Sequence, residues 1–209
     1  MDTSFFLAWI NAIATAVQAE RDHLTQLDAA IGDADHGANL DRGFAAVRQA
    51  LTDAPPQTPG AVLTAAGSAL IRKVGGASGP LYGTAFRQMG RSLGDAAEIT
   101  PEALAAGLEA ALAGIQKLGG AAEGDKTLVD ALAPAVRALG RAVQDGTKLT
   151  DALAATEAAA QEGARATVPL EARKGRASYL GPRSVGHEDP GAASTVLIFA
   201  ALREAAGQA

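Results

Sequence analysis

Apolar residues recur at intervals of three and four along this chain, and that spacing is the strongest constraint on its fold. Phe6, Trp9, Ile10, Ile13 and Val17 lie on one side of a predicted first helix over residues 4–26. No segment shows a convincing strand pattern. Alanine dominates the apolar residues, whereas aromatic residues make up only 4% of the chain, and small side chains let helices approach closely. The sequence therefore predicts an all-α protein.

Cap and turn residues divide the chain into about eight helices, which we assign to a single domain over residues 1–209. The clearest helix start is Thr100-Pro101-Glu102, which supplies a cap residue, a proline in the first turn and an acid near the N-terminus. We also expect a second helix to start near Asn39, Asp125 to cap a sixth, and an eighth to begin after Pro190-Gly191.

The unusual residues gather in predicted loops rather than on helix faces. Four such loops follow the first, third, fifth and seventh helices, at residues 28–39, 75–80, 119–127 and 174–191. In an up-and-down arrangement of antiparallel helices, alternate connections lie at the same end of the bundle. We therefore predict that the four loops form one composite site.

The first loop carries three carboxylates, Asp28, Asp33 and Asp35, in the stretch L-D-A-A-I-G-D-A-D-H-G-A-N. At a spacing of about 4 Å, two carboxylates near a protein surface repel each other by roughly 4 kcal/mol. A hard divalent cation would remove that repulsion and use the oxygens as ligands. The pattern indicates a magnesium site, and magnesium commonly accompanies phosphate. A cluster of helix caps and turns is the alternative, because aspartate favours both.

The other loops carry groups that suit an anion. Gly75-Gly76-Ala77-Ser78-Gly79 offers backbone N–H groups and a hydroxyl beside a helix N-terminus. Arginine donors match phosphate oxygens, and the last loop has four basic residues: Arg173, Lys174, Arg176 and Arg183. The alternatives are an ordinary turn and a solvated loop, and Gly124-Asp125-Lys126-Thr127 also fits a capped helix start. The chain has no G-x-x-x-x-G-K-[ST] loop.

Charge and composition exclude several classes of protein. A net charge of −5 argues against a nucleic-acid backbone as the main partner. The absence of cysteine excludes disulfides and thiolate metal sites. The N-terminus lacks the basic region of a signal peptide, and no uncharged apolar run approaches the ~20 residues that span a bilayer. We expect a cytoplasmic protein without direct contact to nucleic acid or membrane.

Four stretches, in this order and at this spacing, resemble the L subunit of dihydroxyacetone kinase, the nucleotide-binding subunit. They are the aspartate stretch at 27–39, G-G-A-S-G-P-L-Y-G-T at 75–84, G-D-K-T-L-V-D-A-L at 124–132 and A-R-K-G-R-A-S-Y-L-G-P-R-S-V-G-H-E-D-P-G-A at 172–192. Together they span nearly the whole chain. The resemblance implies an eight-helix, up-and-down barrel with a nucleotide and two magnesium ions at one end.

The resemblance also implies roles for individual residues. Asp28, Asp33 and Asp35 would be the metal ligands, and Arg176 would be the catalytic residue that reaches the phosphates. The nucleotide, ADP or ATP, would contact a larger set: His36, Gly37, Ala38, Asn39, Ala77, Ser78, Gly119, Leu128, Arg176, Asp189, Pro190 and Gly191.

In this family the L subunit works with partners. A K subunit holds dihydroxyacetone covalently through its own histidine. In the branch that depends on the phosphotransferase system, a phosphohistidine of an M subunit rephosphorylates ADP that stays bound, and relatives also contact a transcription regulator. Because no K-like domain lies within the 209 residues, we expect a separate subunit of this branch, a phosphotransferase of glycerol metabolism that is active only with its partners.

Three other functions remain compatible with the sequence. The chain would fit an L subunit of an ATP-dependent kinase for dihydroxyacetone or another small keto-sugar. It would also fit a nucleotide-loaded binding module that contacts a regulator. The third is an unrelated all-helical, magnesium-dependent hydrolase, which would act on nucleotides or sugar phosphates without a partner.

Overall fold

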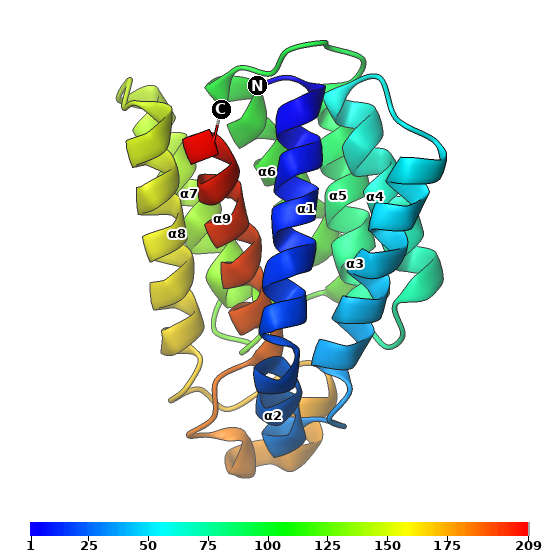
Figure 1. Cartoon of the computed structure of the whole chain (residues 1–209). Coiled ribbons are helices and arrows are strands. Elements are labelled where there is room, and N and C mark those ends of the chain that lie inside the picture. The colour runs from blue at the N-terminus through cyan, green and yellow to red at the C-terminus, as the bar shows by residue number, and fades with distance from the viewer. Residues whose placement is uncertain (209) are drawn as a thin grey trace.

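The computed structural model describes residues 1–208 and places most of them in helices (Figure 1). Within this range there are nine α-helices, one 3₁₀ helix and no strand. The helices are α1 (Thr3–Ala19), α2 (Arg21–Ile31), α3 (His36–Asp53), α4 (Pro59–Lys73), α5 (Ser78–Leu93), α6 (Pro101–Gly119), α7 (Leu128–Gln144), α8 (Leu149–Ala166), η1 (Arg176–Ser184) and α9 (Pro190–Gln208). The predicted all-α fold is confirmed.

The long helices run alternately up and down and enclose a common core (Figure 1). From α3 to α9 each α-helix contacts the next, and α1 contacts both α3 and α9, so the contacts close into a ring. Inside it, the ring of Phe86 lies 5.9 Å from that of Trp9 and 6.3 Å from that of Phe44. Burying each such side chain contributes about 1.5–3 kcal/mol.

Glycine allows α4 and α5 to pack with their backbones in close contact. A Cβ atom on Gly67 would lie 2.5 Å from the carbonyl oxygen of Gly83, and one on Gly83 would lie 2.7 Å from that of Gly67. Gly60 and Gly90 form a second reciprocal pair, since a Cβ on Gly90 would lie 2.6 Å from the carbonyl oxygen of Gly60. The close helix approach expected from the small-residue composition is therefore observed here.

The first predicted helix, residues 4–26, is divided in the structure. α1 ends at Ala19, and Glu20, with φ −96° and ψ 8°, separates it from α2. The break falls in the polar run Q-A-E-R-D at 18–22, where no large apolar side chain is present to be buried. The apolar stripe continues on α2 with Leu24 and Ile31. Because α2 continues α1 toward the same end of the molecule (Figure 1), the predicted parity of the loops is preserved.

The predicted start of α6 agrees with the structure, whereas the predicted starts of α3 and α7 differ from it. Thr100 caps α6 by accepting the N–H of Ala103, as expected. α3 begins at His36, three residues before the predicted start. The cap of α7 is Thr127 rather than Asp125, because the Asp130 carboxylate accepts the N–H of Thr127 and completes a capping box.

The two ends of the molecule are built differently. Both the N-terminus and the last turns of α9 lie at one end, whereas α2, η1 and the four predicted loops lie at the other (Figure 1). Within residues 1–208, none of the helices combines the length and the apolar character that crossing a bilayer requires. The candidate site lies at the loop end.

Candidate functional site

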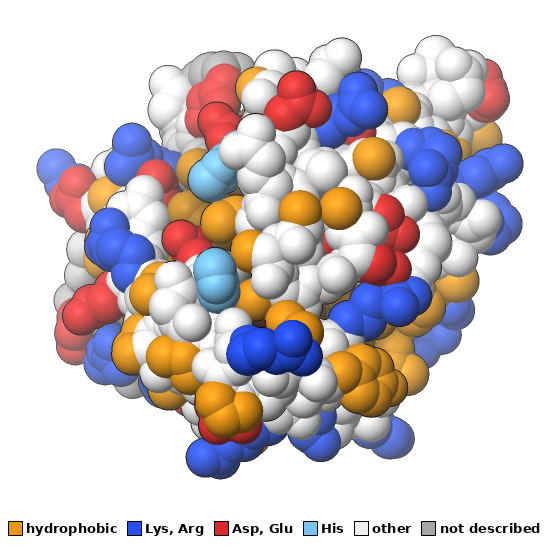
Figure 2. All heavy atoms as spheres, turned by 90° about the horizontal axis from the view of Figure 1, so that it is seen from below, with side chains coloured by type: hydrophobic (Ala, Val, Ile, Leu, Met, Phe, Trp, Pro, Cys, Tyr) orange, Lys and Arg blue, Asp and Glu red, His pale blue; other side chains and the backbone are white. Residues whose placement is uncertain are grey.

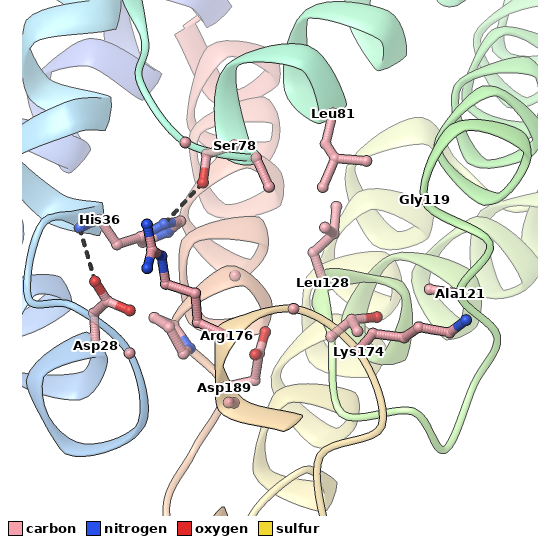
Figure 3. Close-up of a pocket in the computed structure, with 18 of the residues that line it drawn as sticks. Asp28, His36, Ser78, Leu81, Gly119, Ala121, Leu128, Lys174, Arg176 and Asp189 are labelled. Carbon is pink, nitrogen blue, oxygen red and sulfur yellow. Dashed lines mark hydrogen bonds between the residues drawn. The ribbon is translucent and has the colours of Figure 1, made fainter. Parts of the chain in front are cut away.

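A pocket of about 380 Å³ opens at the loop end. Its walls come from all four predicted loops, so these loops do converge. In Figure 3, Asp28 and His36 lie on one side of the pocket, and Leu81, Leu128, Gly119 and Ala121 lie on the other. Figure 2 views the molecule from this end and shows acidic and basic side chains interspersed with hydrophobic ones. Inside the pocket, the side with Asp28 and His36 is the polar half, and the side with Leu81 and Leu128 is the apolar half.

The three aspartates meet in the polar half. One carboxylate oxygen each from Asp28, Asp33 and Asp35 lies within 4.8 Å of the others. Asp28 is buried at the end of α2, and its Oδ2 accepts the backbone N–H groups of Asp35 (2.8 Å) and His36 (3.1 Å). These bonds fold the 33–35 turn back over Asp28.

The backbone of this turn depends on unusual conformations. A Cβ atom at Gly32 would lie 2.0 Å from Oδ1 of Asp28. Ala34, between the two exposed aspartates, has φ +62°, a left-handed conformation that costs a non-glycine residue about 1 kcal/mol or more. Hydrogen bonds to Asp28 hold the turn in place, and the result is a compact set of three carboxylates.

The charge balance of the cluster fits a cation. Within residues 1–208, Asp33 forms a salt bridge with Arg176 (Nε–Oδ2 2.8 Å), while Asp28 and Asp35 form none. The Arg176–Asp33 pair is largely exposed to water, so its attraction offsets little of the repulsion. An all-oxygen ligand set of three carboxylates, open to water on one side, matches what Mg²⁺ prefers.

His36 stands behind the carboxylates, at the first position of α3. Its Nδ1 lies 3.1 Å from Oγ of Ser78 on α5, and its Nε2 lies 2.9 Å from Oγ of Ser194 on α9 (Figure 3 shows the Ser78 contact). Burial lowers the pKa of His36, although Asp28 and Asp35 act in the opposite direction. The ring therefore bridges α5 and α9 through two side-chain hydroxyls.

Three helix N-termini border the pocket. α3 begins with His36, α5 with Ser78 and α9 with Pro190, and all three residues line the pocket. Free backbone N–H groups and the helix dipole make such ends favourable for anions. The three first turns contain no acidic residue, and the acids at these ends are Asp35 before α3 and Asp189 before α9.

Asp189 precedes α9 and lies in the floor of the pocket. Its Oδ2 accepts the N–H of Ala192 (2.7 Å), which caps the helix. Burial raises the pKa of Asp189 to about 7, against the lowering effect of the Ala192 hydrogen bond; Asp130 raises it further and Lys126 lowers it. The carboxyl group is thus poised between its two protonation states near neutral pH.

Lys126 is the functional-site residue whose role the sequence interpretation missed. It is 1% exposed, has φ +61°, and donates from Nζ to the carbonyl oxygens of Thr167 (2.8 Å), Val168 and His187. One ammonium group therefore ties the loop before α7 to both ends of the segment that joins α8 to α9. The only sequence signal is a lysine between turn residues, which does not reveal the distant carbonyls.

The last loop contributes some of its basic residues to the pocket. Arg176 and Lys174 line it, as shown in Figure 3. Arg173 and Arg183 are exposed and do not. Of the four basic residues in the last loop, the structure therefore brings two to the pocket, where an anion was expected.

The apolar half is formed by α5, α6 and the start of α7. Leu128 and Gly119, both singled out from the sequence, lie here together with Leu81, Ile115, Leu118 and Ala121. Leu81, Ile115, Leu118 and Ala121 were not singled out, because the sequence does not distinguish an apolar residue of a pocket from one of the core. The surface suits a flat apolar group such as a nucleobase.

The structure places most of the predicted site residues in the pocket but not all. Gly37, Ala38 and Asn39 do not line it. A Cβ on Gly37 would lie 2.0 Å from the carbonyl oxygen of Arg21, so Gly37 lets α3 pack against α2. Asn39 is buried and its Oδ1 accepts a hydrogen bond from Arg42 (2.6 Å). The remaining predicted residues all line the pocket: Asp28, Asp33, Asp35, His36, Ala77, Ser78, Gly119, Leu128, Arg176, Asp189, Pro190 and Gly191.

Comparison with known proteins identifies the family. The DAK2 domain model matches residues 30–204. The chain is 45% identical over 201 residues to the "PEP-dependent dihydroxyacetone kinase 1, ADP-binding subunit DhaL" of Listeria innocua, covering 96% of each chain. It is 38% identical over 198 residues to the corresponding Escherichia coli subunit, covering 95% of this chain and 94% of that one.

Solved structures agree with this assignment. The dihydroxyacetone kinase of C. freundii in complex with AMP-PNP and Mg²⁺ superimposes with a TM-score of 0.69 at 28% identity, over 94% of this chain. Its native form gives a TM-score of 0.74 at 26% identity, over 96%. This chain corresponds to 33–34% of that longer kinase. The chain belongs to the DAK2 domain family, and the predicted resemblance is confirmed.

Proposed function

We propose that this member of the DAK2 domain family is the nucleotide-binding subunit of a dihydroxyacetone kinase that depends on a phosphotransferase system. The observation that carries the proposal is the composition of one pocket. It joins three clustered carboxylates, two exposed basic side chains and three helix N-termini to an apolar half. Such a combination suits a nucleotide whose phosphates are neutralised by metal ions.

Asp28, Asp33 and Asp35 would hold two Mg²⁺ ions. Magnesium supplies charge neutralisation of phosphate oxygens when it is bound. Asp28 has one oxygen committed to the 33–35 turn, so it orients the ligand set, whereas Asp33 and Asp35 are exposed to the pocket. The donors are all carboxylate oxygens, and this supports magnesium rather than a softer metal.

ADP would lie across the pocket, with its base in the apolar half beside Leu128 and Gly119. Ala77, Ser78, Pro190 and Gly191 would meet the phosphates at the N-termini of α5 and α9. Arg176 would be the catalytic residue, because its guanidinium reaches the carboxylate cluster and matches phosphate oxygens. His36 and Asp189 complete the floor. Gly37, Ala38 and Asn39 would act by shaping the start of α3.

Phosphoryl transfer requires positioning and charge neutralisation more than a protein nucleophile. Bound ADP would accept the phosphoryl group from the phosphohistidine of an M subunit and pass it to dihydroxyacetone held on a K subunit. The relatives named above as PEP-dependent subunits support this branch. A transcription regulator is a further partner that the same surface could contact.

A simple hydrolase is less well supported. His36 and Ser78 do form a close pair, but the other ring nitrogen faces the hydroxyl of Ser194 rather than a carboxylate. A serine nucleophile relies on a base that a third group orients for proton uptake. The pair therefore fits binding better than covalent catalysis.

The second candidate is an ATP-dependent L subunit acting on dihydroxyacetone or another small keto-sugar. It is favoured by the C. freundii kinase solved with AMP-PNP, an ATP analogue, in which a chain of similar fold is part of a longer protein. The two candidates differ in whether the nucleotide stays bound through the reaction cycle.

The deciding experiment is the nucleotide and magnesium content of natively purified protein, released by denaturation and quantified. About one ADP and two Mg²⁺ per chain, retained through long dialysis, are expected of the coenzyme type. A freely exchanging site that still binds ATP would favour the second candidate. Failure to bind either nucleotide would contradict both.

A further inference from the structure

A continuous chain of buried hydroxyl groups runs from the pocket into the interior through His36. The OH of Tyr82 lies 2.7 Å from Oγ of Ser194, which lies 2.9 Å from Nε2 of His36. Nδ1 of His36 lies 3.1 Å from Oγ of Ser78. Ser78 lines the pocket, whereas Ser194 and Tyr82 are 1% and 3% exposed and lie outside it. This series of hydrogen bonds thus connects the Ser78 hydroxyl, in the pocket, to two buried residues that a ligand in the pocket cannot touch.

The hydrogen-bond geometry allows a neutral imidazole at His36 two arrangements of its protons. One ring nitrogen donates and the other accepts. In the first arrangement Ser194 donates to Nε2, and Nδ1–H donates to Ser78, whose own proton is then free to point into the pocket. In the second, Nε2–H donates to Ser194, and the Ser78 hydroxyl donates to Nδ1. The tautomer of His36 therefore decides whether Ser78 is a donor or an acceptor toward a ligand.

A phosphate group selects between them. Ionised phosphate oxygens are acceptors only, so Ser78 serves them only in the first arrangement. We propose that Tyr82 and Ser194 are positioning residues that, through His36, aim the Ser78 hydroxyl proton at a nucleotide phosphate. The inference rests on the proposed function, since it takes the ligand to be a nucleotide.

Tyr82 is the residue that biases the network. The carbonyl oxygen of Gly191 has two lone pairs, yet three hydroxyls surround it: Tyr82 and Thr195 at 2.9 Å, and Ser194 at 3.1 Å. At least one hydroxyl must therefore donate elsewhere. When Tyr82 and Thr195 both donate to Gly191, its two lone pairs are filled, and the Ser194 proton is directed to Nε2 of His36. Without the tyrosine hydroxyl, Ser194 is free to donate to Gly191 and accept from Nε2–H.

The placement along the helices supports the same role. Ser78 and Tyr82 lie one turn apart on α5, so the two ends of the hydrogen-bond network belong to the same helix. Gly191 lies in the first turn of α9 and Ser194 at the start of the second. The network thus holds the N-termini of α3, α5 and α9 in register around the pocket as well as setting the direction of the protons.

The test combines affinity with the tautomer. Tyr82→Phe keeps the buried ring and removes only the hydroxyl, and Ser194→Ala breaks the same chain one step later. Thr156→Val is the matched control, because the Thr156 hydroxyl is equally buried but bonds only the carbonyl of Ala152 within α8. Binding of ADP in excess Mg²⁺ is measured by calorimetry. The His36 tautomer is read from imidazole ¹⁵N shifts, assigned with His23→Gln and His187→Gln.

We expect Nδ1–H in ADP-bound wild type and a shift toward Nε2–H in Tyr82→Phe. Loss of a hydrogen bond to a charged group should weaken ADP binding about tenfold in both network variants, with the control within about twofold. An Nε2–H tautomer in the ADP-bound wild type, or unchanged affinity in both network variants, would overturn the inference alone. Absence of ADP binding to wild type would overturn the proposed function and, with it, this assignment.

Discussion

The helix body and the loop end of this protein are stabilised in opposite ways. Around α4 and α5 the packing is apolar and so close that Cβ atoms on Gly67 and Gly83 would collide with backbone. At the loop end, buried polar groups are held by specific partners: Lys126 by three carbonyls, Asp189 by the start of α9, and His36 by two hydroxyls. Burying polar groups costs stability unless each is paired. Their concentration at the loop end is therefore typical of a functional site.

The largest effect on stability is expected from the body. Phe86→Ala removes the ring that contacts both Trp9 and Phe44, and should lower the free energy of unfolding by about 3–5 kcal/mol. Urea denaturation checks this. The exposed Tyr179, 87% accessible, offers a contrasting control, since Tyr179→Ala should change stability by less than about 0.5 kcal/mol. Equal effects from the two variants would contradict the assignment of the core.

Lys126→Met should have the next largest effect, and it should be confined to the loop end. The substitution removes the charged donor that the carbonyl oxygens of Thr167, Val168 and His187 share, at a cost of about 2–4 kcal/mol. Hydrogen exchange should show increased opening of residues 167–189 while α4 and α5 stay protected. Uniform loss of protection throughout the chain would show that the two regions are not separable.

Asp189 should make stability depend on pH in the opposite sense to an ordinary carboxylate. Its pKa is raised to about 7 in the folded protein, so between pH 4 and 7 the folded state binds a proton that the unfolded state has lost. The stabilisation is complete below the unfolded pKa and is lost as pH rises toward about 7, by up to about 1 kcal/mol per pH unit. Asp189→Asn removes this group.

The measurement for Asp189 is the difference in unfolding free energy between wild type and Asp189→Asn across pH 4–8. Taking the difference cancels the contribution of His36, whose lowered pKa acts in the opposite direction. Relative to the variant, wild type should become less stable as pH rises. A flat difference would show that Asp189 is ionised throughout.

The smallest effect on stability, with a full loss of ligand, is expected from Asp33→Asn. Asp33 is exposed and its partner Arg176 is largely exposed too, so unfolding should change by less than about 0.5 kcal/mol. The same change removes a proposed metal ligand and should abolish retention of Mg²⁺ and ADP in purified protein. Glu123→Gln, which breaks the exposed Glu123–Arg137 pair outside the pocket, is the control. A variant that still carries ADP would contradict the role of Asp33.

Much of the site could be predicted because local sequence carries it. Asp28, Asp33 and Asp35 lie within one turn-forming stretch, and helix periodicity was enough to bring the four loops to one end. Gly37 and Asn39 show the limit: they belong to the same stretch, but Gly37 packs against α2 and Asn39 bonds Arg42, and neither lines the pocket. The split at Glu20 was missed because the apolar stripe continues across it.

The sequence by itself determined the all-α fold, the four loops that line the pocket and the carboxylate cluster, since these depend on the spacing of neighbouring residues. Only the tertiary structure decided which carbonyls surround Lys126, that His36 joins Ser78 to Ser194, and that Tyr82 lies behind them. Those contacts join residues between 41 and 158 positions apart in the chain. They exist only because the helices pack in one arrangement, so no local pattern encodes them.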